Sequence, residues 1–268
     1  MSIWSLIVFA AVQGITEFLP ISSTAHLQLA GKFMDIQPSP TLEVAVHLGT
    51  VFAVIIYFRD DIQQLTLSLC DFIRGKSKHD KDLFFKLFIA TLPIIIVGGI
   101  ASIFFNGLEF RHSLMLIGWT TLIFGVLLYV TDKYGLTIHR IEHISYLNTF
   151  LLGVAQVIAI IPGVSRSGIT ITAMRALGME RSDAARFSML MAIPTILAAG
   201  FGTGVELAIS GNVEMTFQAI LAAILSFGFA LMVIGVLMSW IRNSTFLPFV
   251  IYRIILGVII LVIAYGII

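Results

Sequence analysis

Six long apolar stretches recur along this chain, and each lies between polar or charged residues. A helix that crosses a bilayer needs about 20 mostly apolar residues, and these stretches have about that length. The hydrophobic pattern therefore predicts six transmembrane helices, at residues 42–58, 82–105, 113–130, 184–209, 216–240 and 246–268. Because apolar segments extend from end to end and no long polar block separates them, we expect a single membrane domain over residues 1–268.

Two further apolar regions, residues 1–32 and 145–180, are interrupted in the middle by proline, glycine and serine. The interruptions read "EFLPISSTAH" and "IIPGVSRSGIT". Proline removes a helical hydrogen bond, and glycine is unfavourable inside a helix. Both regions are therefore predicted to fold as helix, break, helix.

The distribution of lysine and arginine predicts which loops face the cytoplasm. Loops 59–81, 131–145, 171–186 and 241–245 hold five, two, three and one basic residues, whereas loops 106–112 and 210–215 hold one and none. By the positive-inside rule the first four loops are cytoplasmic and the last two are outside. The first interrupted region then begins and ends outside, and the second begins and ends in the cytoplasm. Both are predicted to be re-entrant hairpins that enter the membrane from opposite faces.

The sequences around the two interruptions are alike. "FAAVQGITEFLPISST" and "LLGVAQVIAIIPGVSRS" both contain a glutamine (Gln13 and Gln156), further apolar residues, a proline and a hydroxyl cluster, with a one-residue difference in spacing. Inverted-topology repeats of this kind bring broken helices together near the bilayer midplane. We therefore expect an all-α integral membrane protein, with repeats at about 1–130 and 145–268, six full transmembrane helices and two re-entrant helix-loop-helix hairpins.

Composition supports a membrane protein. Apolar residues make up 58% of the chain and charged residues 12%, compared with roughly 45 to 50% and about 25% in soluble domains. The net charge of +1 gives no indication of a nucleic-acid partner, and the single cysteine, Cys70, excludes an internal disulfide and a cysteine-rich metal site.

The first interrupted region carries an unusual set of polar side chains. Glu17 is the one formally charged residue among residues 1–31, and a carboxylate at membrane depth costs at least about 2.5 kcal/mol, so it is expected to face a cavity and to have a partner. Gln13 precedes it by four residues, which places both on one helical face. Beyond Pro20 follow Ser22, Ser23, Thr24 and His26. Packing of small hydroxyl residues between helices is the alternative interpretation.

The second interrupted region supplies an arginine. Arg166 lies between Ser165 and Ser167 at the start of a predicted helix, where freed amides and a guanidinium favour an anion such as phosphate. An ion pair with Glu17 that only ties the hairpins together is the alternative. A carboxylate facing arginine, serine and histidine is suited to phosphoryl transfer, and a site inside the bilayer indicates a lipid phosphate.

Other ionisable residues are interpreted more plainly. Glu43 and His47 are four residues apart at the start of a predicted span, and they either flank the mouth of the site or form a pair at the outer interface, which is the reading we favour from sequence. Four charged residues are expected in a cytoplasmic loop, namely Arg175, Arg181, Asp183 and Arg186.

The motifs "VQGITEFLPISSTAH" and "IPGVSRSGITIT" closely resemble the two signatures of the bacterial undecaprenyl-diphosphate phosphatases of the bacitracin-resistance type, and the similarity extends over the whole chain. The resemblance implies hydrolysis of undecaprenyl diphosphate to the monophosphate carrier of peptidoglycan synthesis. It also implies a divalent cation, Mg or Ca, and a multi-pass protein of the bacterial plasma (inner) membrane whose site opens to the outer side. Expected partners are this lipid substrate and membrane lipid, with a homodimer left open.

Carried over by position, the resemblance assigns the family's paired motif to Gln13 and Glu17, and the cation mainly to Glu17. It assigns the hydroxyl and histidine to Ser23 and His26, and the arginine motif to Ser165, Arg166, Ser167 and Thr170, with Ser22 and Thr24 as further substrate contacts. Ser23 or a water is expected to attack, and whether His26 activates Ser23, protonates the leaving group or attacks stays open. A polyprenyl-phosphate flippase is the alternative function, because broken helices are also typical of transporters.

Overall fold

The computed structural model describes residues 2–34, 39–75, 82–104, 113–210 and 213–266. Within these ranges the fold is helical, and there is no β-strand beyond an isolated bridge between His139 and Met179. The helices are α1 (Ile3–Thr16), α2 (Ser23–Met34), α3 (Pro40–Tyr57), α4 (Arg59–Ile73), α5 (Asp82–Phe104), α6 (Leu114–Tyr134), α7 (Tyr146–Val157), α8 (Arg166–Ala176), α9 (Arg181–Ser210), α10 (Val213–Ile241) and α11 (Leu247–Ala264), with the short 3₁₀ turns η2 (Ile141–His143) and η3 (Ile158–Ile160).

The six predicted transmembrane helices are confirmed in length and composition. Within the described ranges, α3, α5, α6, α9, α10 and α11 are the helices long and apolar enough to cross a membrane. Their ends follow local signals. Ser39 caps α3 ahead of a proline in its first turn, and Ser113 caps α6 by accepting a hydrogen bond from the N–H of Leu116.

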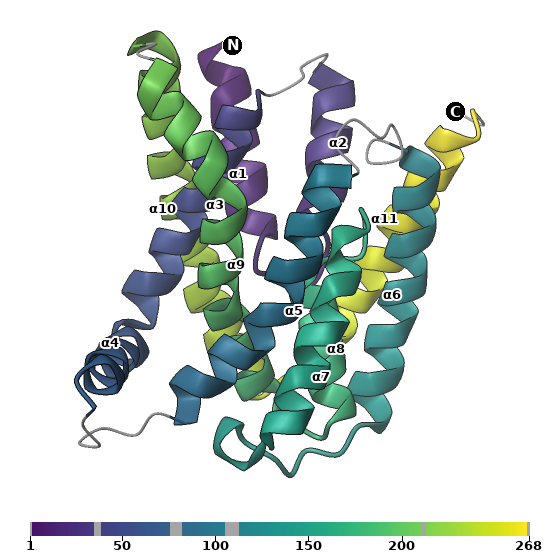
Figure 1. Ribbon diagram of the computed structural model, residues 1–268. Helices are drawn as coiled ribbons and strands as arrows, with labels where there is room; N and C mark the ends of the chain where they lie inside the picture. The colour runs from purple at the N-terminus through teal and green to yellow at the C-terminus, as the bar shows by residue number, and fades with distance from the viewer. Residues whose placement is uncertain (1, 35–38, 76–81, 105–112, 211–212, 267–268) are drawn as a thin grey trace.

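The prediction of a loop over residues 59–81 is wrong for most of its length, because residues 59–73 form α4. Asp60 and Asp61 lie in the first turn of this helix, where carboxylates favour the positive end of the dipole. Phe72 and Ile73 are exposed while Asp61 and Asp71 are buried, so α4 presents apolar side chains outward and turns two carboxylates toward the protein. In Figure 1, α4 lies apart from the bundle, at the end opposite the two termini. Residues 76–81 lie outside the described residues.

The prediction of a loop over residues 171–186 is also wrong for most of its length, because α8 extends to Ala176 and α9 begins at Arg181. Arg175 belongs to α8 and is fully buried, and its Nε donates to Oδ1 of Asp132 over 3.0 Å. Arg181 donates to the same oxygen over 2.7 Å, and the other Asp132 oxygen accepts the N–H of Phe246. Asp132 on α6 therefore joins α8, α9 and the start of α11, since buried charges require partners.

A second group of charges links the same end of the bundle to α4. Arg186 on α9 forms an ion pair with Asp61, and Asp183 accepts the N–H of Ile141 over 3.0 Å. The charges of residues 171–186 were visible in the sequence, but their partners lie on distant helices. These charged side chains are stabilised by ion pairs and hydrogen bonds within the protein, whereas in a loop water would solvate them.

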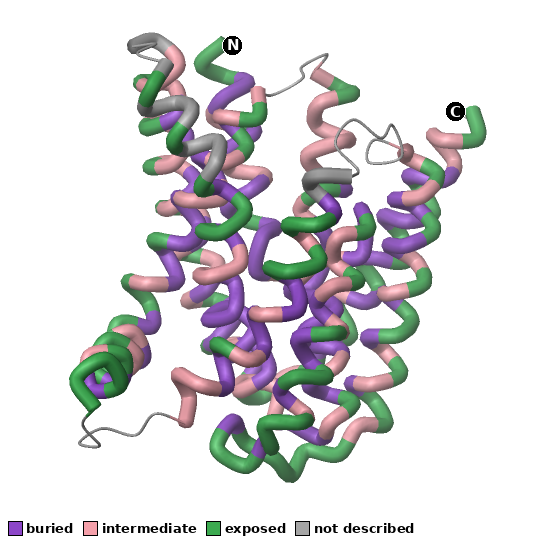
Figure 2. Tube along the Cα trace, viewed as in Figure 1, coloured by how far each residue is buried: buried purple, intermediate pink, exposed green. Residues whose placement is uncertain are grey.

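The two interrupted regions each reverse direction in the middle of the bundle (Figure 1). The outer ends of α1 and α2 lie at the end that carries both termini, whereas the outer ends of α7 and α8 lie at the opposite end. Each hairpin packs on a helix from the other half of the chain, which we call exchanged packing: α1 packs on α10, and α7 packs on α5. Figure 2 shows that the buried residues gather around the breaks and the middle of α9.

The two breaks share an uncommon backbone conformation. Ser22 has a φ of 73° and Ser165 a φ of 72°, and among the described residues they are the non-glycine residues with positive φ. Each serine then caps the returning helix, since Ser22 Oγ accepts the N–H of Ala25 and Ser165 Oγ accepts the N–H of Gly168. Such strain persists only where the surrounding structure enforces it, and it is common at functional sites.

Gly163 in the second break is required by space and by conformation. Its φ is +87°, and a Cβ there would lie 2.6 Å from the carbonyl oxygen of Ile117. We expect Gly163→Ala to lower the free energy of unfolding by about 3 kcal/mol, from left-handed strain and steric overlap together. Gly75 has a φ of +65° and open space around it, so Gly75→Ala is the matched control with about 1 kcal/mol of strain alone. Equal shifts in the unfolding midpoint in detergent would contradict the steric argument.

Candidate active site

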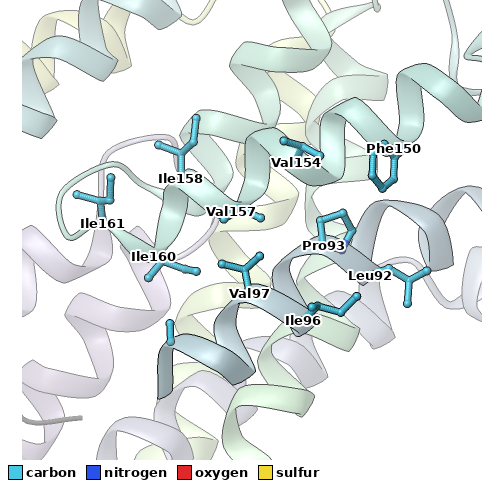
Figure 3. A pocket seen from close by; sticks show the side chains of 11 residues that line it. Leu92, Pro93, Ile96, Val97, Phe150, Val154, Val157, Ile158, Ile160 and Ile161 are labelled. Atoms are coloured by element: carbon cyan, nitrogen blue, oxygen red, sulfur yellow. The ribbon is translucent and has the colours of Figure 1, made fainter. Parts of the chain in front are cut away.

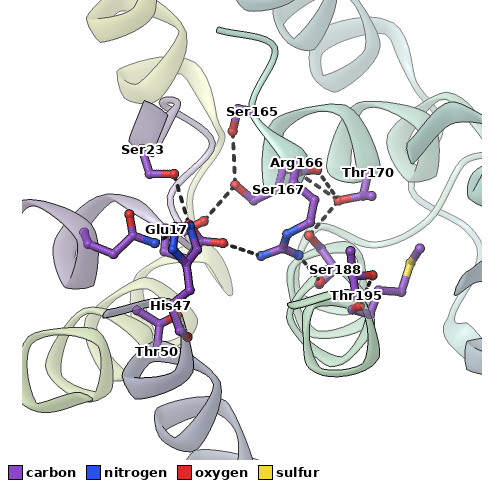
Figure 4. Close-up of polar contacts among 12 residues, drawn as sticks. Glu17, Ser23, His47, Thr50, Ser165, Arg166, Ser167, Thr170, Ser188 and Thr195 are labelled. Carbon is purple, nitrogen blue, oxygen red and sulfur yellow. Dashed lines mark hydrogen bonds and ion pairs between the residues drawn. The ribbon is translucent and has the colours of Figure 1, made fainter. Parts of the chain in front are cut away.

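Glu17 is the centre of a buried polar cluster where the two breaks meet (Figure 4). Its side chain is 6% exposed. Oε2 accepts hydrogen bonds from Gln13 Nε2 over 2.7 Å and from Ser23 Oγ over 3.0 Å. Oε1 accepts a hydrogen bond from Arg166 Nη2 over 3.0 Å. The predicted partners of Glu17 are thus brought together from α1, the first residue of α2 and the first residue of α8.

The Arg166 guanidinium is held between Glu17 of the first hairpin and α9. Its Nη1 donates to the carbonyl oxygen of Ser188 over 3.1 Å, so the guanidinium spans from Glu17 to α9. An arginine has five N–H groups in a planar fork, and these contacts are made by one terminal nitrogen each. The guanidinium is therefore suited to bind an anion while it stays oriented by Glu17.

Ser165, Ser167 and Thr170 support Arg166 from its own side. Ser167 Oγ donates to the carbonyl oxygen of Leu19 over 2.9 Å, which joins the two breaks directly. Thr170 Oγ1 lies 2.7 Å from Ser188 Oγ and donates to the carbonyl oxygen of Arg166. These hydroxyls are buried or half-buried and their hydrogen bonds are internal, so their contacts position the arginine.

The two remaining hydroxyls of the first motif lie apart from this cluster. Ser22 is buried and caps α2. Thr24 is exposed on α2, and within the described residues no hydrogen bond joins it to Glu17 or Arg166.

His26 faces a different groove from Ser23. Its Nδ1 lies 2.7 Å from the carbonyl oxygen of Ser22, so Nδ1 carries the proton, and Nε2 lies 2.6 Å from the hydroxyl of Tyr252. The two rings are stacked with centroids 5.5 Å apart, in a groove between α1 and α11 that also contains Leu19. The sequence left open whether Ser23 pairs with His26. In the structure the Ser23 hydroxyl donates its hydrogen bond to Glu17.

His47 belongs to the site, although sequence favoured an interface pair. Its Nε2 lies 3.7 Å from Oε2 of Glu17, and its Nδ1 lies 2.7 Å from the carbonyl oxygen of Glu43. The spacing of Glu43 and His47 was visible, but the packing of α3 on α1 brings the ring to the carboxylate. The alternative that places this pair beside the site is the one the structure supports for His47.

Arg253 is a further residue that the sequence interpretation missed. It is fully buried in α11, and its guanidinium donates to the carbonyl oxygens of Pro20, Gly163 and Val164, at 3.4, 3.1 and 3.0 Å. These acceptors belong to both breaks, so one side chain satisfies backbone groups freed where the helices end. A signal was present, because Arg253 is the one charged residue among residues 246–268.

The side-chain oxygens of Glu17 and Gln13 could supply some, but not all, of the ligands of a divalent cation. Gln13 Oε1 is buried and has no hydrogen-bond partner among the described residues, and amide and carboxylate oxygens are ligands of Mg²⁺ and Ca²⁺. No group of three or more histidine, cysteine, aspartate or glutamate side chains with metal-binding geometry occurs in the described part of the chain. A cation held by Glu17 and Gln13 would therefore need phosphate oxygens and water to complete its shell, as is usual for Mg²⁺.

Comparisons with known proteins show the family to which this chain is similar. The model of the family described as "Bacitracin resistance protein BacA" matches residues 6–259. A protein of Dinoroseobacter shibae named "Undecaprenyl-diphosphatase" is 42% identical over 269 residues, which cover 99% of this chain and 100% of the relative. A Jannaschia protein of the same name is 43% identical with the same coverage. "Undecaprenyl-diphosphatase 1" of Rhodospirillum rubrum is 41% identical over 99% of this chain and 96% of its own length.

Proposed function

The chain belongs to the bacitracin resistance protein BacA family, and on that premise we propose that it hydrolyses undecaprenyl diphosphate to undecaprenyl phosphate and orthophosphate. The observation that carries the proposal is the contact of one buried carboxylate, Glu17, with both a serine hydroxyl and an arginine from the opposite hairpin. This arrangement offers a nucleophile, a proton acceptor and an anion-binding group within hydrogen-bonding distance.

The mechanism follows from these contacts. Arg166 binds equatorial oxygens of the terminal phosphate, because its planar fork matches them. Ser23 Oγ attacks the terminal phosphorus and its proton passes to Glu17. The bond from phosphorus to the bridging oxygen breaks, and undecaprenyl phosphate leaves with that oxygen and with the proton from Glu17, which becomes a carboxylate again. Water then attacks the phosphoserine with Glu17 as base, which releases orthophosphate and restores the serine hydroxyl.

Glu17 takes the role of base in this proposal in preference to His26. A base must lie within about 2.6–3.2 Å of the atom that loses the proton, and Ser23 Oγ is 3.0 Å from Glu17. His26 instead fixes the start of α2 through the Ser22 carbonyl and meets Tyr252 at the groove. We assign it a positioning role at the start of α2.

Gln13 and Glu17 are the residues that would hold the divalent cation. When bound, Mg²⁺ or Ca²⁺ supplies charge stabilisation to the phosphate oxygens. Gln13 offers a neutral oxygen where a second carboxylate would add charge, so the substrate's own phosphates carry more of the binding. His47, at 3.7 Å from Glu17, adds an imidazole to the same edge of the site.

We further propose that the two hairpins are re-entrant and belong to an inverted-topology repeat. The matched serines with positive φ and the exchanged packing of α1 on α10 and α7 on α5 support this arrangement. Basic residues gather at the end opposite the termini, which supports a cytoplasmic face there. The site would then open to the outer side of the plasma membrane. A flippase is not favoured, because the curated relatives carry the name of a hydrolase.

Orthophosphate release by the purified protein in detergent tests the function. With undecaprenyl diphosphate and Mg²⁺ we expect turnover, and with a chelator we expect at least about a 100-fold loss that added Mg²⁺ reverses. Gln13→Leu is expected to raise the Mg²⁺ concentration at half activity by removing an oxygen ligand. Full activity in the chelator would contradict the cation, and no phosphate release from the folded protein would contradict the hydrolase.

A further inference from the structure

A second polar side chain faces the Arg166 side of the site from within the second hairpin. A cavity of about 540 Å³ lies between α5, α9 and the end of α7, and its lining includes Arg166, Gln156 and Thr195. Gly98 and Gly99 of α5 contribute space to the same cavity. The rest of its lining is mostly apolar, so these polar groups stand out as the part that could recognise a polar ligand.

Gln156 is the member of this lining that internal contacts do not explain. It is fully buried, and neither its amide nitrogen nor its carbonyl oxygen has a hydrogen-bond partner among the described residues. Its counterpart in the first hairpin, Gln13, donates to Glu17. A buried amide without partners costs stability, because it has lost its hydrogen bonds to water. A glutamine retained there is therefore expected to serve a ligand that enters the cavity.

An apolar groove continues from this cavity to the outside of the bundle. The groove has a volume of about 860 Å³ and lies between α5 and the α7–η3 segment. Figure 3 shows Val97 and Ile96 on one wall and Val154 and Val157 on the other. Ala101 and Ile160 line both the groove and the cavity, so the two spaces adjoin. Phe150 and Ile161 are 47% and 41% exposed, which leaves the groove open to lipid.

We propose that the substrate lies along this path, with its first isoprene units in the groove between α5 and α7 and its diphosphate in the cavity. The Gln156 amide then binds the phosphate nearer to the isoprenyl chain, while Arg166 binds the terminal phosphate. The inference rests on the proposed hydrolase function. It makes Gln156 a substrate-binding residue and assigns the entry route to the α5–α7 side.

The chemistry of each space matches one part of an isoprenyl diphosphate. The groove is lined by apolar side chains, which match the isoprenyl chain. In the cavity, the neutral amide of Gln156 can donate to a phosphate oxygen without adding charge. The groove between α1 and α11 is the competing route for the chain. It is lined by His26 and Tyr252, is smaller at about 460 Å³, and does not include Arg166 in its lining.

Three substitutions test the proposed position of the substrate in the cavity and the groove. Gln156→Leu removes an unpartnered buried amide, so it is expected to keep or raise the unfolding temperature while it raises KM. Gly98→Leu fills the cavity at a position where a Cβ would meet nothing within 4 Å, and it replaces a residue that weakens helices. Val154→Trp narrows the groove, and Val236→Trp on α10, which is 65% exposed, is its matched control.

The experiment measures orthophosphate release from undecaprenyl diphosphate and from farnesyl diphosphate by the purified protein. We expect Gln156→Leu and Gly98→Leu to raise KM for both substrates about tenfold, and Val154→Trp to raise KM only for the long chain, with Val236→Trp unchanged. Unchanged KM values for Gln156→Leu and Val154→Trp would overturn the inference. It would also be overturned if Ile15→Trp, in the groove between α1 and α11, selectively raised KM for the long chain.

Binding separates this inference from the proposed function. An undecaprenyl methylene-diphosphonate, which cannot be hydrolysed at the bridge, is titrated against the same variants by tryptophan fluorescence or calorimetry. If wild-type protein releases no phosphate but binds this probe, and Gln156→Leu binds it about tenfold more weakly, the hydrolase proposal fails while the binding site stands. If phosphate is released and the variants bind the probe like wild type, the binding site fails while the hydrolase stands.

Discussion

Glu17→Gln is expected to lower kcat for phosphate release by about 10³-fold. The substitution keeps the shape of the side chain but removes the carboxylate that accepts the Ser23 proton and orients Arg166. General-base catalysis contributes about 10²–10⁴-fold, and loss of the cation ligand acts in the same direction. The measurement is steady-state phosphate release at saturating substrate and Mg²⁺, with folding checked by gel filtration and the unfolding temperature.

Glu180→Gln is the matched control for this prediction. Glu180 forms a partly exposed ion pair with Arg140 at the far end of the bundle, so its loss is expected to leave kcat within about twofold of wild type. Retention of more than a tenth of wild-type kcat by folded Glu17→Gln would rule out the assigned role of the carboxylate.

Arg253→Met is expected to lower the free energy of unfolding by about 3–5 kcal/mol and to reduce kcat strongly. The side chain is fully buried and donates to Thr121 as well as to three carbonyl oxygens at the breaks. Methionine fills much of the same volume but satisfies none of these acceptors, and buried unpaired carbonyls are costly. Both breaks would lose their shared anchor, so Glu17 and Arg166 would no longer be held at 3.0 Å.

Arg253→Lys and Arg140→Met distinguish this effect from a general loss of charge. Lysine presents its donors at one point and cannot span the same acceptors, so an intermediate loss is expected. Arg140 is exposed, and Arg140→Met is expected to change stability by less than about 1 kcal/mol. If Arg253→Met unfolded at the wild-type temperature with wild-type kcat, the anchor role would be refuted.

Much of the site was predictable, because placing its charged and polar side chains in lipid costs free energy. Glu17 and Arg166 were identified as isolated charges within apolar regions, and the structure joins them across 149 positions. Arg253 carried the same signal but lies in an unbroken span, and it was missed. Its acceptors come from two breaks far away in the chain, and that convergence has no local pattern.

The charges at the end of the bundle opposite the two termini show what local sequence does not predict. Arg175 and Arg181 were expected in a cytoplasmic loop, because that loop is rich in basic residues. Burial against Asp132 depends on three helices packing at one point. His47 is similar, since its distance of 3.7 Å from Glu17 depends on how α3 lies against α1.

The sequence by itself determined which segments are helices of membrane length, where two of them break, and which polar side chains must find partners. These properties depend on local composition and on the cost of placing polar groups in lipid. The tertiary structure alone decided that Ser23 pairs with Glu17 and not with His26, that His47 joins the site, and that Arg253 holds both breaks. Those contacts depend on helix packing and side-chain rotamers among residues far apart in the chain, which hydrophobic pattern and spacing do not encode.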